Sequence, residues 1–578
     1  MFFVVDKPRL QRMISIVRED RKPNKQGQDA PFIRLKATEN ELTVSSDTVS
    51  ATFPATVYEK GVLFLRTTYI TFIEELVMCN AQFRQVLLYP LLLFSVSFFP
   101  PNTWAQISSV HVDKPALSRH LNREGFLEIN GSARLIIGIY ELPKDDDGLD
   151  EIARNGFNLV RVSQNVETLD RLKRHNLHGW ICLGSTVILK ESDLEGERKL
   201  SQIINAFKDH PSLLVWELPD EALWNIWWSR FHWIFGGQRA ELRKYIEKVK
   251  GQEQDHKASE WLSLLRKADE YDDRGLWKRA EGIYDRLWKE LRIKNPHPDW
   301  KMSLCPELAD ELTQEVARGC RVIRQLDSKH IIWQNHAPRN SVMSLRKYNQ
   351  AVDAAGCDIY PVPFSPTSGH SDLKDTNISS VGAYTDRMRE AAPGKSIWMV
   401  LQGFGWRDLS ESGTNDPDVR KGRRPTFSET RFMAYDAIVH GANAILYWGT
   451  HSIEKDCSLW RDILRVTKEL RALEPGIVAQ PPKQAPVVIA DETYGSIDGQ
   501  GPRIMLRKTQ KDWVLIAVNE HSQGIAFTIK GLPEELEGKT LYRLYSKETH
   551  IISDGRFHDG IASFGVQVYA TSKRFEIE

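Results

Sequence analysis

The chain has 578 residues, which is too long for one ordinary domain and predicts two to four domains. Hydrophobic residues make up 41% and charged residues 27%, which is typical of a globular protein and excludes a disordered one. Lysine plus arginine and aspartate plus glutamate both number 77, so the zero net charge gives no electrostatic footprint for nucleic acid or for an anionic membrane.

Residues 1–77 are predicted to form a small α+β extension, with a helix over 7–18 followed by strands over 32–37, 42–46, 51–55 and 61–66. The stretch 35–66 resembles one piece of a bacterial DNA-polymerase sliding clamp. This resemblance implies a replication-clamp-related protein as one alternative. The neutral charge argues against it, and a single incomplete piece could not close a ring.

Residues 78–105 have the three parts of a secretory signal. Arg84 supplies the basic start, 86–99 form an apolar run, and Ala105 offers a small residue for cleavage. The run is short for a membrane helix, so no stable membrane span is expected after processing, although a buried core helix or strand pair is the alternative. We therefore expect a secreted or periplasmic protein that begins at Met78, with 1–77 as an upstream extension.

Residues 106–480 alternate between apolar strands and amphipathic helices, after a hairpin with an Asn-Gly turn at 130–131. This alternation predicts an α/β protein built on a (β/α)8 TIM barrel. The expected barrel strands are 134–142, 158–163, 179–184, 213–217, 331–336, 357–361, 396–402 and 444–449.

Two further regions depart from the barrel pattern. Residues 224–300, between the fourth and fifth strands, have helical spacing and predict an inserted helical subdomain, which either shapes the active-site cleft or only packs on the rim. Residues 481–578 contain short strands (486–490, 513–518, 525–529 and 541–545) and predict a C-terminal β-sandwich.

The fourth strand ends in a cluster of three carboxylates, Glu217, Asp220 and Glu221. Active sites of (β/α)8 barrels lie at the C-terminal ends of the strands, where such acids can act on a sugar bond. A solvated acidic loop is the alternative. The 17 tryptophans are either core residues or platforms for sugar rings.

From Phe126 to Pro475 the chain resembles glycoside hydrolases of clan A, which include β-galactosidases and cellulases. Asp220-Glu221 matches the clan's Asn-Glu pair, so the resemblance implies Glu221 as general acid/base. It also implies that Arg161 orients a carboxylate and that Tyr360 and Trp448 lie near the sugar. The Asn-to-Asp change at 220 keeps an acceptor but loses an amide donor.

The seventh strand departs from the clan. Gln402 stands at or next to the nucleophile position, and a neutral amide cannot form a glycosyl ester. Three explanations follow: a nucleophile from elsewhere, an inverting enzyme, or a barrel that binds sugars without cleaving them. The nearest strand-end carboxylates are those of Asp358, Glu141 and Glu217.

Asp358 is the second catalytic candidate, with a structural hydrogen-bond acceptor as the alternative. Glu141 either reacts or pairs with Arg161. Other strand-end side chains are suited to sugar contacts; they are Asn335 with its neighbours Gln334 and His336, Gln402 through its amide, and the rings of Phe404 and Trp406.

His336 is alone among metal-ligand types there, and none of the six cysteines lies in a CxxC pair, so no metal or other cofactor is expected. We interpret the chain as a glycoside hydrolase whose partner is a poly- or oligosaccharide and not nucleic acid. The leading alternative is a carbohydrate-binding pseudoenzyme that lacks the seventh-strand nucleophile.

Overall fold

The computed structural model describes short strands within residues 2–66, and then residues 121–250, 255–363, 377–409, 422–491 and 501–577. The chain forms two units, Met1–Val110 and His111–Glu578, which are treated separately below. The helix predicted over 7–18 and the signal-like segment 78–105 lie outside the described residues.

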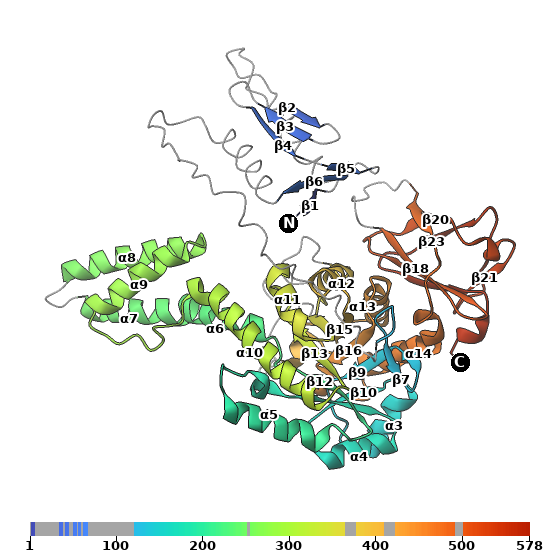
Figure 1. The fold of residues 1–578 in the computed structure, drawn as a ribbon, viewed down its shortest axis with the longest axis horizontal. Helices are drawn as coiled ribbons and strands as arrows, with labels where there is room; N and C mark the ends of the chain where they lie inside the picture. Colours follow the sequence, from blue (N-terminus) through green and yellow to red (C-terminus); the bar gives the residue numbers. More distant parts are fainter. Residues whose placement is uncertain are drawn as a thin grey trace, which may run out of the picture. The chain divides into compact units, whose positions relative to one another are not determined.

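The described part of the first unit consists of two antiparallel sheets, with strand orders β1-β6-β5 and β2-β3-β4 (Figure 1). Four of these strands overlap the predicted ones and confirm the β pattern. The strands are Phe2–Val5 (β1), Arg34–Ala37 (β2), Glu41–Ser45 (β3), Ser50–Pro54 (β4), Thr56–Tyr58 (β5) and Val62–Arg66 (β6).

The centre of the second unit is a closed barrel of parallel strands, ordered β9 to β16 with β16 paired back to β9. This confirms the predicted (β/α)8 barrel. The strands are Ile136–Ile139 (β9), Leu159–Val162 (β10), His178–Cys182 (β11), Leu213–Glu217 (β12), Ile331–His336 (β13), Ala354–Ile359 (β14), Ser396–Gln402 (β15) and Ala444–Trp448 (β16).

Two barrel strands start more than one residue away from the predicted position. β9 begins at Ile136 because the preceding residues form the hairpin β7 (Leu127–Ile129) and β8 (Ser132–Arg134), whose Asn-Gly turn has positive φ at both residues. β14 begins at Ala354, before the predicted residue 357, because its neighbours β13 and β15 supply the ladder despite the small side chains there.

Amphipathic helices cover the barrel (Figure 1). They begin at caps such as Asp145 and Asn165, whose side chains accept from backbone N–H groups in the first turn. The helices are Asp146–Arg154 (α3), Val166–Arg174 (α4), Leu194–Phe207 (α5), Cys305–Leu326 (α10), Val342–Tyr348 (α11), Ser380–Ala391 (α12), Phe427–Val439 (α13) and Ser458–Ile477 (α14). None of the helices in the described ranges is long and apolar enough to cross a membrane.

Large side chains fill the barrel, so it is a packed core and not a pore. The ring centroids of Trp333 and Trp398 lie 5.6 Å apart. A Cβ atom on Gly138 would lie only 2.4 Å from the Leu446 side chain, so there is no room for one. Because strand side chains alternate, one set faces this interior and the other faces the helices. Trp216 belongs to the outer set, since its Nε1 donates to Asp327 at 2.8 Å.

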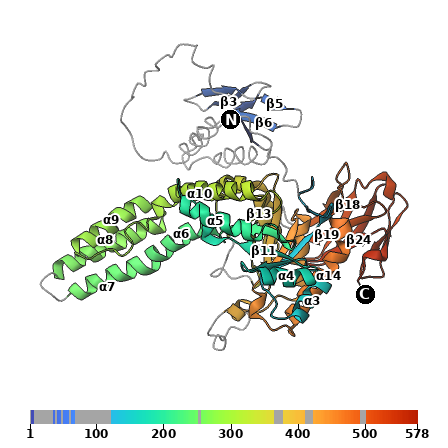
Figure 2. The same cartoon turned by 60° about the horizontal axis from the view of Figure 1, so that its bottom comes forward.

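The predicted helical insertion is confirmed between β12 and β13. It comprises α6 (Ala222–His232), a π-helical turn (Trp233–Gln238), α7 (Arg239–Val249), α8 (Asp255–Asp273) and α9 (Trp277–Glu290). Figures 1 and 2 show α7, α8 and α9 side by side, joined to the barrel through α6. The insertion has its own hydrophobic core, which includes Leu242, Trp261 and Tyr284.

The C-terminal region forms two antiparallel sheets, β17-β20-β23 and β18-β19-β24-β21-β22, which share a core that includes Leu515 and Phe527. This agrees with the predicted sandwich, although the prediction lacks four of its strands, β18, β22, β23 and β24. The strands are Val487–Ala490 (β17), Pro502–Lys508 (β18), Trp513–Asn519 (β19), Ile525–Lys530 (β20), Thr540–Arg543 (β21), Thr549–Ile551 (β22), Arg556–Ile561 (β23) and Val566–Ala570 (β24).

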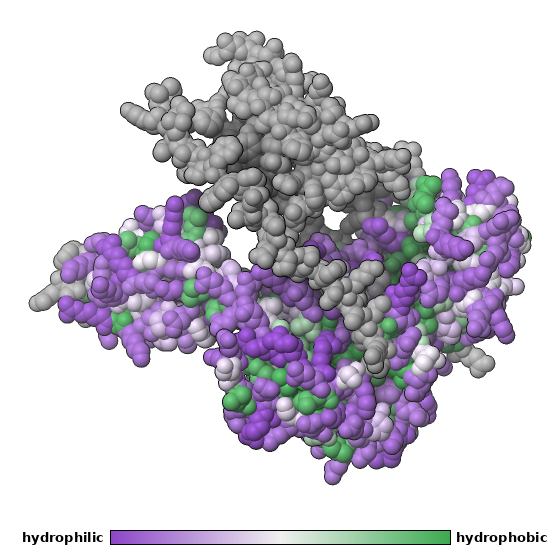
Figure 3. Space-filling view, in the orientation of Figure 1, coloured by the Kyte–Doolittle hydropathy of each residue, from purple (hydrophilic) through white to green (hydrophobic). Residues whose placement is uncertain are grey.

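Strand β19 joins the sandwich to the barrel. Leu515 and Ala517 pack in the sandwich core, whereas Val514 and Ile516 pack in the barrel core. Both faces are therefore buried, which explains why this strand is apolar at nearly every position. The face drawn in Figure 3 is, by contrast, largely hydrophilic with scattered apolar residues.

A charged network lies at the same junction. His440, which follows α13, has its Nδ1 2.9 Å from Asp386 and its Nε2 2.9 Å from Glu520 at the end of β19. Burial alone would lower the pKa of His440, but these hydrogen bonds and nearby Asp436 raise it to about 10. The imidazolium therefore bridges a barrel helix and the sandwich.

Candidate active site

The turn after β12 places Glu221 over the mouth of the barrel. Leu218 N–H donates to the carbonyl of Trp333 at 2.9 Å, and Glu221 N–H donates to that of Asn335 at 3.1 Å. Glu221 has φ 47°, in the left-handed region, and the helix α6 starts at the next residue. The turn is thus fastened to β13, and these contacts hold the backbone of Glu221 in place.

The carboxyl groups of Glu221 and Asp358 lie within hydrogen-bonding reach of each other and are here called the dyad. Asp358 ends β14 and is only 4% exposed. Burial raises the pKa of Asp358 well above its usual range, and the charges of Glu221 and Asp220 raise it further. Burial also raises the pKa of Glu221, with Asp220 adding to the effect and the hydrogen bond from Asp358 opposing it. Burial and the neighbouring carboxylates thus shift both groups of the dyad toward their protonated forms.

Glu217 lies deeper in the barrel and is fully buried. Arg161 Nε donates to its carboxylate at 2.8 Å and Trp180 Nε1 donates at 3.1 Å. The predicted pairing of Arg161 with Glu141 is wrong, because Glu141 binds Lys455 instead. Arg161 does orient a carboxylate, as the resemblance implies, and Glu217 has a structural role beneath the dyad.

Asn335 belongs to the inner face of β13, and its Nδ2 donates to Asp220 at 2.9 Å. Its neighbours lie on the outer face of the strand, contrary to the predicted sugar contacts. Tyr348 donates to Gln334 Oε1 at 2.8 Å, and Gln334 Nε2 donates at 2.9 Å to the carbonyl of Pro219, in the turn before Glu221. His336 Nε2 lies 2.8 Å from Asn349. The strand's alternation sends only every second side chain inward.

Gln402 is fully buried and bound to the backbone. Its Oε1 accepts from Val362 N–H at 2.9 Å, and its Nε2 donates to the carbonyl of Phe404 at 3.0 Å and to that of Val362. These contacts tie the ends of β14 and β15 together. They leave neither amide proton for a sugar hydroxyl, so the expected contact between this amide and substrate is not supported.

Aromatic rings close the side of the mouth opposite β12. Tyr360 and Trp448 stack with centroids 5.5 Å apart and an angle of 21° between their planes. Phe404 is fully buried beneath them and fills the mouth, whereas Trp406 and Trp448 remain partly exposed. One face of Trp448 is thus covered by Tyr360, and the ring retains exposed surface beside the dyad.

Tyr140 is a site residue that the sequence analysis does not single out. Its hydroxyl is buried without a hydrogen-bond partner among the described residues, and the Arg161 guanidinium lies 5.5 Å from its ring centroid. Burial and the negative charges of Glu217, Asp220 and Asp358 raise the pKa of Tyr140. Its position at the end of β9, two residues after the inward-facing Gly138, is the signal that could have found it.

The mouth therefore brings together Arg161, Asp220, Glu221, Asn335, Asp358, Tyr360 and Trp448, and holds Gln402 beneath the surface. Within the described ranges, the clusters with metal-ligand spacing lie elsewhere, at Asp436, His440 and Glu520 and at Glu548, His550 and Asp559.

No protein-family model and no curated protein matches the chain. Solved structures are similar at low sequence identity. A beta-galactosidase from Bacillus circulans is 11% identical over 76% of this chain and 99% of that one, with a TM-score of 0.43. A family 5 glycoside hydrolase from Bacteroides vulgatus is 12% identical over 78% and 92%, with a TM-score of 0.42.

A beta-galactosidase from Marinomonas ef1 is 14% identical, with a TM-score of 0.37. Here the match covers 58% of this chain and 60% of that protein, so the chain spans less than two thirds of it. These findings describe a structural similarity to glycoside hydrolases and add nothing in support of the sliding-clamp alternative.

Proposed function

We propose that the protein hydrolyses O-glycosidic bonds of a poly- or oligosaccharide, with Glu221 as general acid/base. The observation that carries this proposal is the dyad, in which Glu221 and the buried Asp358 lie together at the C-terminal end of the barrel and burial raises the pKa of both. A carboxyl group that keeps its proton at neutral pH is what protonation of a sugar leaving group requires.

The reaction adds water across one C–O bond. Glu221 donates its proton to the glycosidic oxygen as that oxygen leaves the anomeric carbon. The hydroxyl of a water molecule bonds to the same carbon, and its remaining proton returns to the dyad. In this proposal Trp448 supplies a platform for the sugar ring, Asn335, which donates to Asp220, contacts its hydroxyl groups, and Arg161 holds Glu217.

A single-displacement mechanism is consistent with the glutamine at the end of the seventh strand, β15. Gln402 cannot act as a nucleophile and is bound to the backbone. An inverting enzyme needs no nucleophile, because its second carboxylate activates water instead. We therefore infer that Asp358 takes this second role and that the product has inverted configuration. Proton NMR of the first-formed sugar tests this, and a retained anomer would contradict it.

The test of the proposal is turnover of a panel of aryl glycosides and polysaccharides by wild type and Glu221→Gln protein. Losing the general acid should lower kcat about 10²–10⁴-fold. Glu141→Gln is the matched control, because Glu141 pairs with Lys455 outside the dyad. Hydrolysis by Glu221→Gln protein at the wild-type rate would refute the assignment.

A carbohydrate-binding pseudoenzyme is the second candidate, and the burial of Gln402 at the nucleophile position favours it. The same panel separates the two functions. Sugar binding without turnover of any substrate would establish the binding protein in place of the hydrolase.

The proposed substrate is consistent with export of the protein, which we propose from the signal-like segment 78–105. Mass spectrometry of the natural protein's N-terminus tests this expectation. A mature N-terminus near Met1 would contradict it.

A further inference from the structure

Helix α6 carries a ladder of aromatic rings that begins beside the dyad. Trp224, Trp227, Trp228 and Phe231 follow one another at helical spacing, and Phe235 continues the row in the next turn. Trp227 stacks on Phe231 at 4.6 Å, and Trp224 lies 5.5 Å from Trp228 with 22° between their planes. The rings are therefore close to parallel along the helix.

Only part of this ladder supports the fold. Trp227, Phe231 and Phe235 pack against the core of the insertion. Trp224 and Trp228 belong to none of the hydrophobic clusters of the described residues, and Trp228 is 41% exposed. Trp224 is only partly buried and Trp228 is exposed, so a tryptophan pair outside these cores needs another explanation.

The pair lies on the face of α6 that leads away from the dyad. Asn225, Trp228 and His232 are not buried, and their spacing from Glu221 places all four positions on one helical face. At 1.5 Å per residue, this face runs about 16 Å from Glu221 to His232. It is long enough for several consecutive sugar rings.

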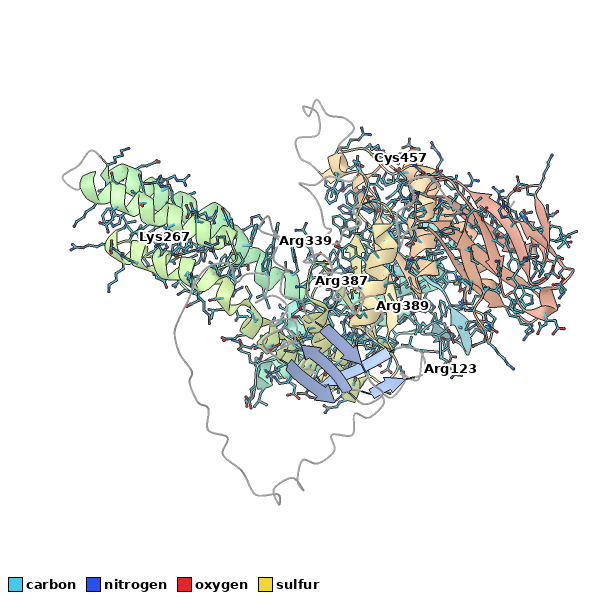
Figure 4. The ribbon with its side chains drawn as sticks, turned by 90° about the horizontal axis from the view of Figure 1, so that it is seen from above. Arg123, Lys267, Arg339, Arg387, Arg389 and Cys457 are labelled. Atoms are coloured by element: carbon cyan, nitrogen blue, oxygen red, sulfur yellow. The ribbon has the colours of Figure 1, made fainter. Side chains whose placement is uncertain are left out.

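Two contacts fasten the start of this face to the barrel. Asn225 Nδ2 donates to the carbonyl of Asp220 at 3.1 Å, which joins the first turn of α6 to the acidic turn. The Arg339 guanidinium, from the segment between β13 and α11, lies 5.8 Å from the Trp224 ring centroid. Figure 4 shows Arg339 where the insertion meets the barrel. The Trp224–Trp228 pair therefore begins next to the turn that carries the acids of the candidate active site.

We propose that the Trp224–Trp228 pair binds sugar rings of a polysaccharide whose cleavable bond lies at the dyad, an inference that rests on the proposed hydrolase function. The C–H faces of sugar rings pack on aromatic rings, while Asn225, His232 and Arg339 offer hydrogen bonds to hydroxyl groups. Two rings framed by polar side chains form too small an apolar area for a stable protein interface. The enzyme therefore acts on a polymer.

Affinity gel electrophoresis of the full chain tests this proposal with four soluble probes: mixed-linkage β-glucan, xylan, galactan and galactomannan. We expect at least one polysaccharide to retard the wild-type protein. Trp228→Ala should raise its dissociation constant about tenfold, and Trp224→Ala similarly, through loss of a stacking contact. Trp228→Phe should restore part of the affinity, which separates lost stacking from misfolding.

Tyr245→Ala is the matched control, because Tyr245 is 39% exposed on α7 of the same insertion but lies off this face. It should bind as wild type does. Wild-type protein that binds none of the probes, or Trp228→Ala protein that binds as tightly as wild type, would overturn the proposal. A Trp228→Ala change that alters the molar mass in light scattering without altering polysaccharide binding would instead assign the pair to contact with a second copy.

The outcome is separable from that of the proposed hydrolysis, because binding is measured without turnover. Polysaccharide binding lost in Trp228→Ala protein, together with full activity of Glu221→Gln protein, would retain the binding surface and reject the catalytic assignment.

Discussion

The protein has two charged clusters in its interior, one made of neighbouring acids and one in which acids are paired with cations. At the barrel mouth, Glu221 and Asp358 are two acidic groups within hydrogen-bonding reach of each other, and burial raises the pKa of both. At the junction with the sandwich, His440 lies between Asp386 and Glu520, with Arg503 2.7 Å from Glu520. Opposite charges are matched there, whereas at the mouth they are not.

The arrangement of charge distinguishes a cluster that stabilises the fold from one that is suited to chemistry. Burial raises the pKa of Asp358 because its charged form is disfavoured, whereas carboxylate partners raise the pKa of His440 because its charged form is favoured. A matched cluster stabilises a junction. A mismatched one in a barrel mouth is where proton-transfer chemistry is expected.

Replacement of His440 should have the largest effect on stability. His440→Ala leaves Asp386 and Glu520 without their shared cation, which should lower the free energy of unfolding by about 3–5 kcal/mol. Denaturant unfolding monitored by hydrogen exchange of the β19 amides would measure this. His558→Ala, at a largely exposed histidine, is the control, and an equal loss in both variants would contradict the matched-cluster interpretation.

The two clusters should also differ in their pH windows. The pKa of His440 is raised from 6.5 to about 10, so its stabilising contribution is complete below pH 6.5 and is lost as the pH rises through 10. The pKa of Asp358 is raised from 3.8, so its stabilising contribution is complete below pH 3.8 and is likewise lost as the pH rises. Thermal midpoints measured across this range should fall less steeply for His440→Gln than for wild type. Parallel curves would contradict the assignment.

A carboxylate at position 402 tests whether the mouth lacks only a nucleophile. The side chain introduced by Gln402→Glu could not donate to the carbonyls of Phe404 and Val362, so the free energy of unfolding should fall by about 1–3 kcal/mol. We expect no gain in glycoside turnover. Gln510→Glu, on an exposed turn, is the control, and a faster enzyme of unchanged stability would show that Gln402 is not a structural tie.

The smallest expected change in stability is that of Asp358→Asn. An amide resembles the protonated carboxyl group that the folded state already favours, so the free energy of unfolding should rise by at most about 1 kcal/mol. Glycoside turnover should nevertheless be lost. A destabilisation as large as that of His440→Ala, measured in the same denaturant series, would show that Asp358 is a structural acceptor instead.

Part of the site was predictable from residue pattern. The carboxylates of Glu221 and Asp358 follow apolar strands, and parallel strands of a closed barrel present such ends at one mouth. It could therefore be expected that the two carboxyl groups lie at the same mouth, although not that they lie within hydrogen-bonding reach of each other. The ladder on α6 was also present in the sequence, but the exposure that separates Trp228 from Trp227 depends on the packing of the insertion.

Other predicted side-chain positions were wrong or were left open, because the sequence pattern does not determine the register of a strand. A slip of one residue reverses the face of every side chain in a strand, so the inward position of Glu217 and the outward positions of Gln334 and His336 were not determined by the pattern. The partner of Arg161 was likewise not determined by strand order, because Arg161 on β10 reaches past β11 to Glu217 on β12.

The amino-acid sequence by itself determined the barrel, its insertion and the C-terminal sheets, because apolar periodicity and turn residues act over short distances along the chain. Only the tertiary structure decided which acids pair, which amide is bound to the backbone and which cation joins barrel to sandwich. Those contacts depend on angstrom-scale distances between residues far apart in the sequence, and they follow from strand order and side-chain packing.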